Sequence, residues 1–296
     1  MTSPTLTWWA TLCAVSVLNV LAWTLAVMHA RRRQPLHEPR TWSSMRLQML
    51  LSAGYVAGCA YRSVFPVYDV QRLTLVDGWW SSVFVGRSVA TLAELCFVIQ
   101  WALLLRIVAT DTGNRFGLLV SRWLVPMIVV AEVCSWYAVL TTSNIGHVVE
   151  ESLWGLGAAL LVASLALSCL RSRRELRPML AAVCVIGAGY VIYMFHIDVP
   201  MYWARWVHDL EQGRQFLSIA EGLADTTGRW IVSHRWADWH TEIVWMSLYF
   251  SVAVWLSISL IHATGRFASR PLVRPIDGED PHSMDQGSFA RDASGS

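Results

Sequence analysis

One short segment of the chain places an imidazole and two carboxylates within about one helical turn. In the run Gly146-His147-Val148-Val149-Glu150-Glu151, His147 precedes Glu150 by three residues and Glu151 by four. Side chains at these spacings share one face of a helix. Imidazole nitrogens and carboxylate oxygens bind divalent metals and also act as general bases. The segment therefore predicts a metal site or an acid–base site.

Two further histidine and acid pairs occur where apolar stretches end or begin, His196 with Asp198 and His240 with Glu242. If these helix ends adjoin, side chains from three helices converge on one pocket. The predicted metal ligands are then His147, Glu151, His196 and His240, and the predicted catalytic groups are Glu150, Glu151 and Asp198. Such a set suits zinc or iron, because no thiolate or methionine cluster accompanies it. The alternative is a belt of polar helix ends that bind water and lipid headgroups.

Two carboxylates near the middle of apolar stretches, and an arginine close to one of them, stand out. Glu94 and Glu132 fall near the middle of two successive stretches, and Arg87 precedes Glu94 by seven residues, which places both on one helical face. Ionisable groups at membrane depth are costly and face protein or a cavity. We expect Arg87, Glu94 and Glu132 to be buried charges, either in a proton or ion path or in a structural clasp between helices.

A fourth group of charges lies between the second and third apolar stretches. Arg62, Asp69 and Arg72 alternate in sign along this link. They predict an ordered, ion-paired lid over the outer mouth of the protein. An ordinary solvated loop is the alternative.

Composition indicates what positions these groups. The chain has 296 residues, of which 55% are hydrophobic and 15% charged, and its mean hydropathy is +0.42. An ordinary soluble domain is about 25% charged, so these values indicate a polytopic membrane protein. We predict an all-α fold with seven transmembrane helices, near 5–30, 43–65, 82–107, 119–141, 148–170, 179–198 and 241–263.

The arginines predict the orientation. Sixteen fall in 31–46, 106–122, 171–177 and 266–291, and seven lie in the remainder of the chain. The positive-inside rule then puts the N-terminus outside and the C-terminus in the cytoplasm, in a bacterial inner membrane. We expect a transmembrane domain over 1–263, with an external segment 199–240 that contains an amphipathic helix at 208–224. We expect a disordered cytoplasmic tail over 264–296.

The sequence also excludes some chemistry and limits the partners. All 23 basic residues other than histidine are arginine, so that a retinal Schiff base and any other lysine chemistry are impossible. None of the six cysteines forms a C-x-x-C pair, and we expect them to be small buried apolar residues. The expected partners are the lipid bilayer and a lipophilic or small-molecule ligand, with no nucleic acid. The oligomeric state stays open.

Three functions are compatible with these residues. The leading hypothesis is a membrane-embedded enzyme that uses a divalent metal near the outer leaflet to act on a lipid or lipophilic substrate. The second is a proton-coupled transporter or channel that uses Glu94 and Glu132. The third is a non-catalytic sensor or accessory subunit, in which the polar side chains only hold the helices together.

Overall fold

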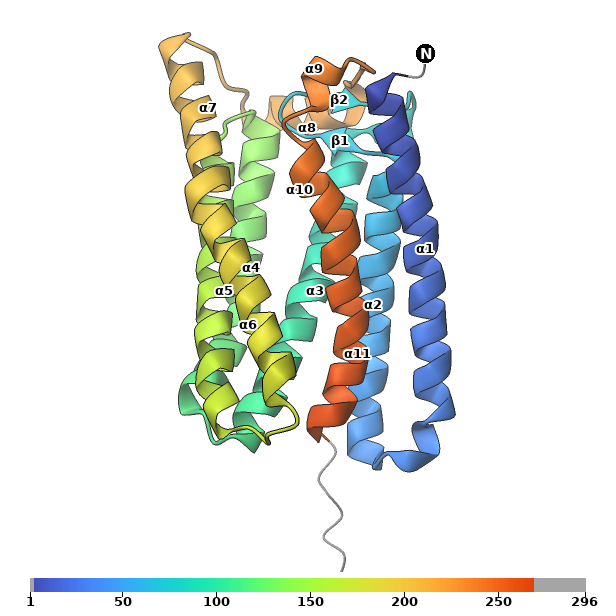
Figure 1. The fold of residues 1–296 in the computed structure, drawn as a ribbon. Coiled ribbons are helices and arrows are strands. Elements are labelled where there is room, and N and C mark those ends of the chain that lie inside the picture. Colours follow the sequence, from blue (N-terminus) through green and yellow to red (C-terminus); the bar gives the residue numbers. More distant parts are fainter. Residues whose placement is uncertain (1–2, 269–296) are drawn as a thin grey trace, which may run out of the picture.

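Long helices run side by side in an elongated bundle (Figure 1). The computed structural model describes residues 3–268, and within them the fold is almost entirely helical, as expected. The helices of the bundle are α1 (Pro4–Arg32), α2 (Pro39–Val64), α3 (Val83–Asp111), α4 (Arg115–Thr141), α5 (Ile145–Arg171), α6 (Arg177–Tyr193), α7 (Val199–Glu211), α10 (Ile243–Leu248) and α11 (Val254–Ala268). A π-helical turn, Met194–Asp198, joins α6 to α7, and another, Tyr249–Ala253, joins α10 to α11.

Within residues 3–268, six helices are long and apolar enough to cross a membrane, and they indicate a multi-pass membrane protein. They are α1, α3, α4, α5, the combined helix Arg177–Glu211 and the combined helix Ile243–Ala268. The second predicted span corresponds to α2, which is a long helix but is not among the six. This helix packs against α1, α3 and α11, and its polar Gln48 and Ser52 are buried there. Because much of its surface contacts other helices and not lipid, α2 can carry more polar side chains than the six apolar helices, and its hydropathy is lower.

Two glycines bring α2 close to α3. Gly54 and Gly58 lie one turn apart, and a methyl group on them would come within 2.8 Å of Cys96 Sγ and 2.6 Å of Ala93 Cβ. Small residues at this spacing let membrane helices approach closely. The glycines thus fix the distance between α2 and α3.

A small cap covers the end of the bundle at which the N-terminus lies (Figure 1). It contains β1 (Val67–Tyr68), β2 (Leu73–Thr74), β3 (Ile231–Val232), α8 (Ile219–Gly228) and α9 (Trp236–Trp239). In the sheet, β2 pairs antiparallel with β1, Val67 opposite Thr74, and parallel with β3, Leu73 opposite Ile231. The 3₁₀ turn Trp79–Ser81 also lies in the link to α3, and the 3₁₀ turn Gln34–Leu36 joins α1 to α2.

The amphipathic helix expected over 208–224 is not one helix. α7 ends at Glu211, and Gly213 has a left-handed backbone (φ 63°) that breaks the helix. α8 begins only at Ile219, because Ser218 and Glu221 form a reciprocal capping box. The prediction missed this second start signal.

Two other boundaries differ from expectation. The sixth helix does not end at 198 but continues to Glu211, and Pro200 lies in the first turn of α7, after the π-helical turn Met194–Asp198. The extra residue of such a turn accommodates the backbone hydrogen bond that proline cannot make. The predicted tail also begins too early, because α11 continues to Ala268. The rest of that tail, 269–296, lies outside the described residues.

Candidate functional site

A cavity of about 520 Å³ lies between α3, α5, α6 and the combined helix α10–α11. Much of its wall is apolar, with side chains such as Phe97, Trp101, Leu161, Val183 and Leu256. Its polar wall, which reaches the residues of the cap, consists of Arg62, Tyr68, Asp69, Arg87, Glu94, Asn144, His147, Glu150, Glu151, Tyr190, Tyr193, Asp198, Tyr202, Glu242 and Tyr249. The two π-helical turns both contribute to the wall, through Met194 and Asp198 and through Tyr249 to Ala253. The cavity therefore combines an apolar chamber with an acidic region.

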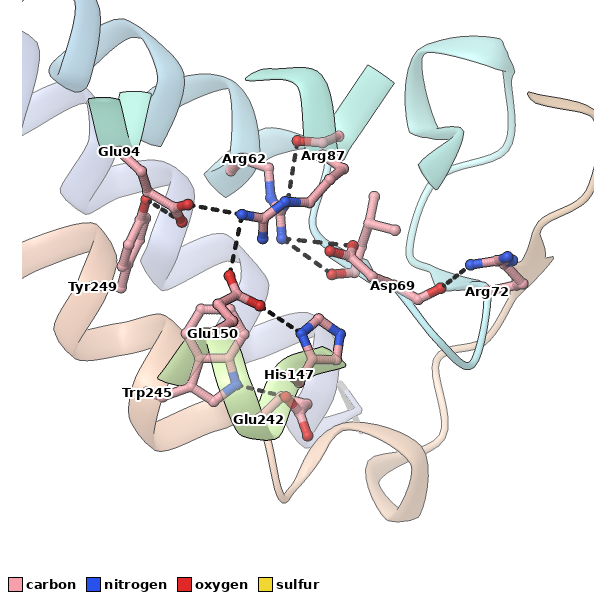
Figure 2. A network of polar contacts seen from close by, with 12 residues as sticks. Arg62, Asp69, Arg72, Arg87, Glu94, His147, Glu150, Glu242, Trp245 and Tyr249 are labelled. Carbon is pink, nitrogen blue, oxygen red and sulfur yellow. Dashed lines mark hydrogen bonds and ion pairs between the residues drawn. The ribbon is translucent and has the colours of Figure 1, made fainter. Parts of the chain in front are cut away.

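Arg87 is the centre of the polar region. Its Nη2 atom lies 2.8 Å from Glu94 Oε2, 2.6 Å from Glu132 Oε2 and 3.2 Å from Glu150 Oε1. Figure 2 shows the guanidinium between Glu94 and Glu150. The side chains of Arg87, Glu132 and Glu150 are almost fully buried, whereas that of Glu94 is slightly exposed. The three carboxylates thus connect α3, α4 and α5 through one arginine.

Each of these carboxylates has a second partner. Tyr249 Oη donates to Glu94 Oε1 at 3.0 Å, and Thr91 Oγ1 donates to Glu132 Oε2 at 2.7 Å. His147 Nδ1 lies 2.7 Å from Glu150 Oε2 (Figure 2). The helical spacing that suggested a common face for His147 and Glu150 thus corresponds to a direct contact.

Glycine packing brings α5 into this cluster. A methyl group on Gly146 would collide with Cys134 O of α4, so only glycine permits the two helices to meet here. Asn114 holds the other end of α5, since its Nδ2 donates to Ser164 O and Ser168 Oγ, both at 2.9 Å. The close approach at Gly146 places Glu150 beside Glu132.

The Arg87 cluster contains more negative than positive groups. One guanidinium faces three carboxylates, whose oxygens lie within 4.8 Å of one another. Uncompensated charges are costly in a low-dielectric interior, so that protons or another cation must balance the excess. Oxygen atoms at this spacing suit a divalent metal, but Arg87 already binds all three carboxylates. A metal ion in this position would therefore have to displace the guanidinium.

Glu151 and Asp198 differ from the acids around Arg87. Both line the cavity, and within residues 3–268 the side chain of neither makes a hydrogen bond or an ion pair. Glu151 comes from α5, and Asp198 from the π-helical turn that follows α6. They are therefore the carboxylates that are available to a molecule in the cavity.

A second ion pair closes the rim of the cavity. Arg205 Nη2 on α7 lies 3.0 Å from Glu242 Oε1, and the guanidinium also lies over the rings of Tyr68 and Tyr202, 5.5 and 5.3 Å from their centroids. Trp245 Nε1 donates to Glu242 Oε2 at 2.5 Å (Figure 2). Cation–π contacts of this kind stabilise a partly buried arginine. The rim thus links α7, β1 and α10.

The predicted lid residues form an ordered structure and not a solvated loop. Arg62 donates to Gly86 O and Val67 O, at 3.1 and 3.3 Å, and lies 3.9 Å from Asp69 Oδ1. Arg72 is fully buried in a left-handed conformation (φ 57°). The turn between β1 and β2 is therefore fixed by Arg62 at one end and by the buried Arg72 at the other.

The partner of Arg72 lies far away in the sequence. Arg72 Nε lies 2.7 Å from Asp225 Oδ2 of α8, and its Nη2 donates to Val139 O of α4 at 2.8 Å. Burial raises the pKa of Asp225, but hydrogen bonds from Arg229 and Arg72 outweigh it and hold that pKa below its ordinary value. Arg72 thus fastens α8 and the β1–β2 turn to the end of α4.

Two of the predicted metal ligands do not reach the cavity. His196 is exposed, and its Nδ1 lies 3.2 Å from Ile192 O. His240 is also exposed, and its Nδ1 lies 2.9 Å from Ala237 O. The prediction that the three helix ends would bring His147, Glu151, His196 and His240 together is therefore wrong. Asp198 is two residues beyond His196, and residues at this spacing on a helix point in different directions.

Sequence reasoning missed several residues of the site. Tyr249 and Asp225 bind charged groups of the site or of the cap but lie far from them in the sequence. Arg205 was considered as a partner of the charges between the second and third spans, whereas it pairs with Glu242. Asp225 carried a usable signal, because it is a charge in the segment 199–240. The sequence offered no comparable signal for Tyr249.

Neither the protein-family models, nor the curated proteins, nor the solved structures contain a match to this chain.

Proposed function

We propose that the protein binds a membrane-soluble amphiphile with a positively charged headgroup in the cavity between α3, α5, α6 and α10–α11. The observation that carries this proposal is the division of the cavity wall into an apolar chamber and an acidic region with two carboxylates, Glu151 and Asp198, that lack a partner. Ligand sites typically combine an apolar wall with a few polar groups that orient the ligand.

The charge of the wall supports a cationic headgroup. Among the described residues, six carboxylates and two arginines line the cavity: Asp69, Glu94, Glu150, Glu151, Asp198 and Glu242, against Arg62 and Arg87. Arg205 compensates Glu242 from outside the wall. An ammonium group near Glu151 and Asp198 would balance part of the remaining excess through ion pairing with these carboxylates.

The apolar chamber supports a hydrocarbon chain. Its wall is made by helices that are apolar enough to span a membrane, and α6 contributes Val183, Ile186, Gly187 and Tyr190. α6 packs mainly on α5, and much of its remaining surface is exposed. A chain of lipid dimensions could therefore enter past α6 without crossing water.

Glu151 and Asp198 are also the groups best placed for acid–base chemistry on a bound headgroup. Glu150, which the sequence suggested as a third catalytic group, is occupied by Arg87 and His147. A carboxylate that contacts a ligand and has no protein partner can take up or release a proton. An enzymatic function would accordingly use Glu151 and Asp198.

The proposed setting is a bacterial inner membrane, with seven spans, the N-terminus outside and the C-terminus inside. Arginines gather at the end opposite to the cap, in the α1–α2 and α5–α6 connections. The positive-inside rule supports this end as cytoplasmic, and the acidic region then lies in the outer half of the bundle. A green fluorescent protein fused to the C-terminus should fluoresce. A dark fusion that an external protease removes would contradict this orientation.

Binding can be tested with purified protein in a maltoside detergent and radiolabelled dodecyltrimethylammonium as the probe. The double variant Glu151→Gln/Asp198→Asn should bind the probe at least about tenfold more weakly, because it removes the two unpaired charges. Glu211→Gln, an exposed acid at the end of α7, is the matched control and should bind as the unchanged protein does. Equal competition by dodecyl sulfate would contradict the proposal, since an anionic headgroup should be repelled.

Proton-coupled transport is the alternative, and the position of Glu94 and Glu132 at membrane depth favours it. Their pairing with Arg87 fits a structural clasp better, because a strong ion pair resists proton exchange. Glu132 does not line the cavity within the described residues. Glu132→Gln should therefore preserve binding of dodecyltrimethylammonium within about twofold. Proton uptake by proteoliposomes that is lost in Glu132→Gln would instead support transport.

A further inference from the structure

A second, smaller cavity lies at the other end of the bundle, in the connection between α1 and α2. It has a volume of about 400 Å³ and is lined by Arg31, Arg32, Gln34, Pro35, His37, Pro39 and Trp42. These residues come from the last turn of α1, the 3₁₀ turn Gln34–Leu36 and the first turn of α2. The groove is therefore separate from the acidic cavity.

The groove carries positive charge without a compensating partner. Arg31 and Arg32 are exposed, and within residues 3–268 the side chain of neither makes a hydrogen bond or an ion pair. The acid nearest in sequence is Glu38, which is exposed and does not cap α2 with its side chain. Two guanidinium groups are thus available to an anion.

Other donors in the groove also lack an acceptor. Nδ1 of His37 is buried and has no hydrogen-bond partner. Because Glu38 does not cap α2, the first backbone amides of this helix, those of Arg40 and Thr41, lack a side-chain acceptor. The positive end of a helix dipole attracts anions such as phosphate. Side-chain and backbone donors therefore point to the same kind of ligand.

Apolar side chains flank the groove on the membrane side. Leu25 and Met28 of α1 are exposed, and Leu36 beside the groove is 81% exposed. Trp42 lines the groove itself, and indole rings favour the headgroup level of a bilayer. A phosphate held in the groove would therefore have its attached acyl chains next to apolar protein surface.

We propose that the groove formed by Arg31, Arg32, His37 and Trp42 binds the phosphate headgroup of an anionic phospholipid. Basic pockets at the cytoplasmic ends of membrane helices bind such headgroups. The site does not depend on the ligand of the acidic cavity. It would anchor the α1–α2 connection at the membrane surface.

The test uses the full chain, purified in detergent, and counts retained lipids by native mass spectrometry. The probes are phosphatidylglycerol, phosphatidylcholine and inorganic phosphate. Arg31→Gln/Arg32→Gln should weaken phosphatidylglycerol binding at least about tenfold. Arg171→Gln/Arg174→Gln removes the same charge from the exposed α5–α6 connection and is the matched control, for which binding should stay within about twofold.

Two results would overturn the proposal. Equal weakening in both double variants would show a general charge effect, and inorganic phosphate that displaces phosphatidylglycerol at equal concentration would identify free phosphate as the ligand. If the double arginine variant misfolds, His37→Ala provides a second test, because it keeps both arginines. It should weaken phosphatidylglycerol binding about threefold, and no change would contradict a role for the imidazole.

Discussion

Two of the buried polar clusters in the described part of the bundle differ in charge and in access. The cluster around Arg87 joins α3, α4 and α5, carries three carboxylates and lies against the cavity. The second cluster joins α2, α3 and α11 through Gln48, Gln100, Ser52 and Ser257, all neutral and fully buried. Both hold helices together at membrane depth. Only the first has a charge excess beside an open volume, and this difference separates a candidate site from a structural clasp.

The neutral cluster satisfies most of its polar groups internally, and among its side-chain atoms only Gln48 Oε1 is buried without a hydrogen-bond partner. Gln48 and Gln100 each donate to the backbone carbonyl of the other, at 3.0 and 3.2 Å. Ser257 Oγ donates to Gln100 Oε1 at 2.6 Å. None of these residues lines the acidic cavity. Interhelical hydrogen bonds of this type contribute about 0.6 kcal/mol each, so that the cluster stabilises the bundle modestly.

Removing the central charge of the first cluster should have the largest effect. Arg87→Met leaves three buried carboxylates without their shared partner, and breaking a buried ion pair costs about 3–5 kcal/mol. We expect a large fall in the unfolding temperature in detergent. Arg235→Met, at an exposed arginine of the cap, is the control and should leave that temperature unchanged. If Arg87→Met lowered the free energy of unfolding by less than about 1 kcal/mol, the cluster would not be the charged clasp described above.

The same variant should create a metal site. In Arg87→Met the oxygens of Glu94, Glu132 and Glu150 are free to bind a divalent cation, and binding stabilises the folded state by mass action. Mn²⁺ or Zn²⁺ should therefore raise the unfolding temperature of the variant but not that of the unchanged protein. Elemental analysis after dialysis gives the stoichiometry. A metal that stabilises the unchanged protein equally would show that metal binding does not depend on the removal of Arg87.

The sequence predicted the charged cluster only in part, for a physical reason. Arg87, Glu94 and Glu132 stand out because ionisable residues are rare in apolar stretches. Glu150 joins them through the close approach of α5 to α4 at Gly146, which depends on packing and not on local pattern. His196 was misplaced because α6 continues as one helix past its expected end and because residues two apart on a helix face different ways. His240 was misplaced because it follows the short helix α9 of the cap, where its ring contacts Ala237 O. The long helices themselves were predictable from hydropathy alone.

The cap offers a third kind of charged contact, outside the bundle. Asp225 binds both Arg72 and Arg229, and its pKa lies below the ordinary value. The contact therefore stabilises the folded protein above the ordinary pKa of aspartate, and this stabilisation is lost as the pH falls through the lowered pKa. Asp225→Asn should lower the free energy of unfolding by about 1–3 kcal/mol at neutral pH, because Arg72 stays buried without its carboxylate partner.

Proteolysis of the cap is the measurement for this contact, since α8 should loosen before the bundle unfolds. Cleavage near α8 should become faster in Asp225→Asn and, in the unchanged protein, in strong acid. Glu211→Gln should behave as the unchanged protein. If strong acid accelerates cleavage as much in Asp225→Asn as in the unchanged protein, the effect of acid does not come from protonation of Asp225.

The smallest effect is expected in the neutral cluster. Gln100→Leu alone removes the side-chain donor to the Gln48 and Ser257 carbonyls and the acceptor of the Ser257 hydroxyl, and a buried group left without its partner costs about 1–3 kcal/mol. The double variant Gln48→Leu/Gln100→Leu removes both side chains that need a partner and adds apolar volume, so that its unfolding free energy should fall by less than about 1 kcal/mol. Thermal unfolding of both variants gives this comparison. Their binding of dodecyltrimethylammonium should equal that of the unchanged protein, because the cluster has no contact with the cavity. A double variant that folds normally but loses the probe would show that the two polar clusters are coupled through α3, and the distinction between clasp and site would fail.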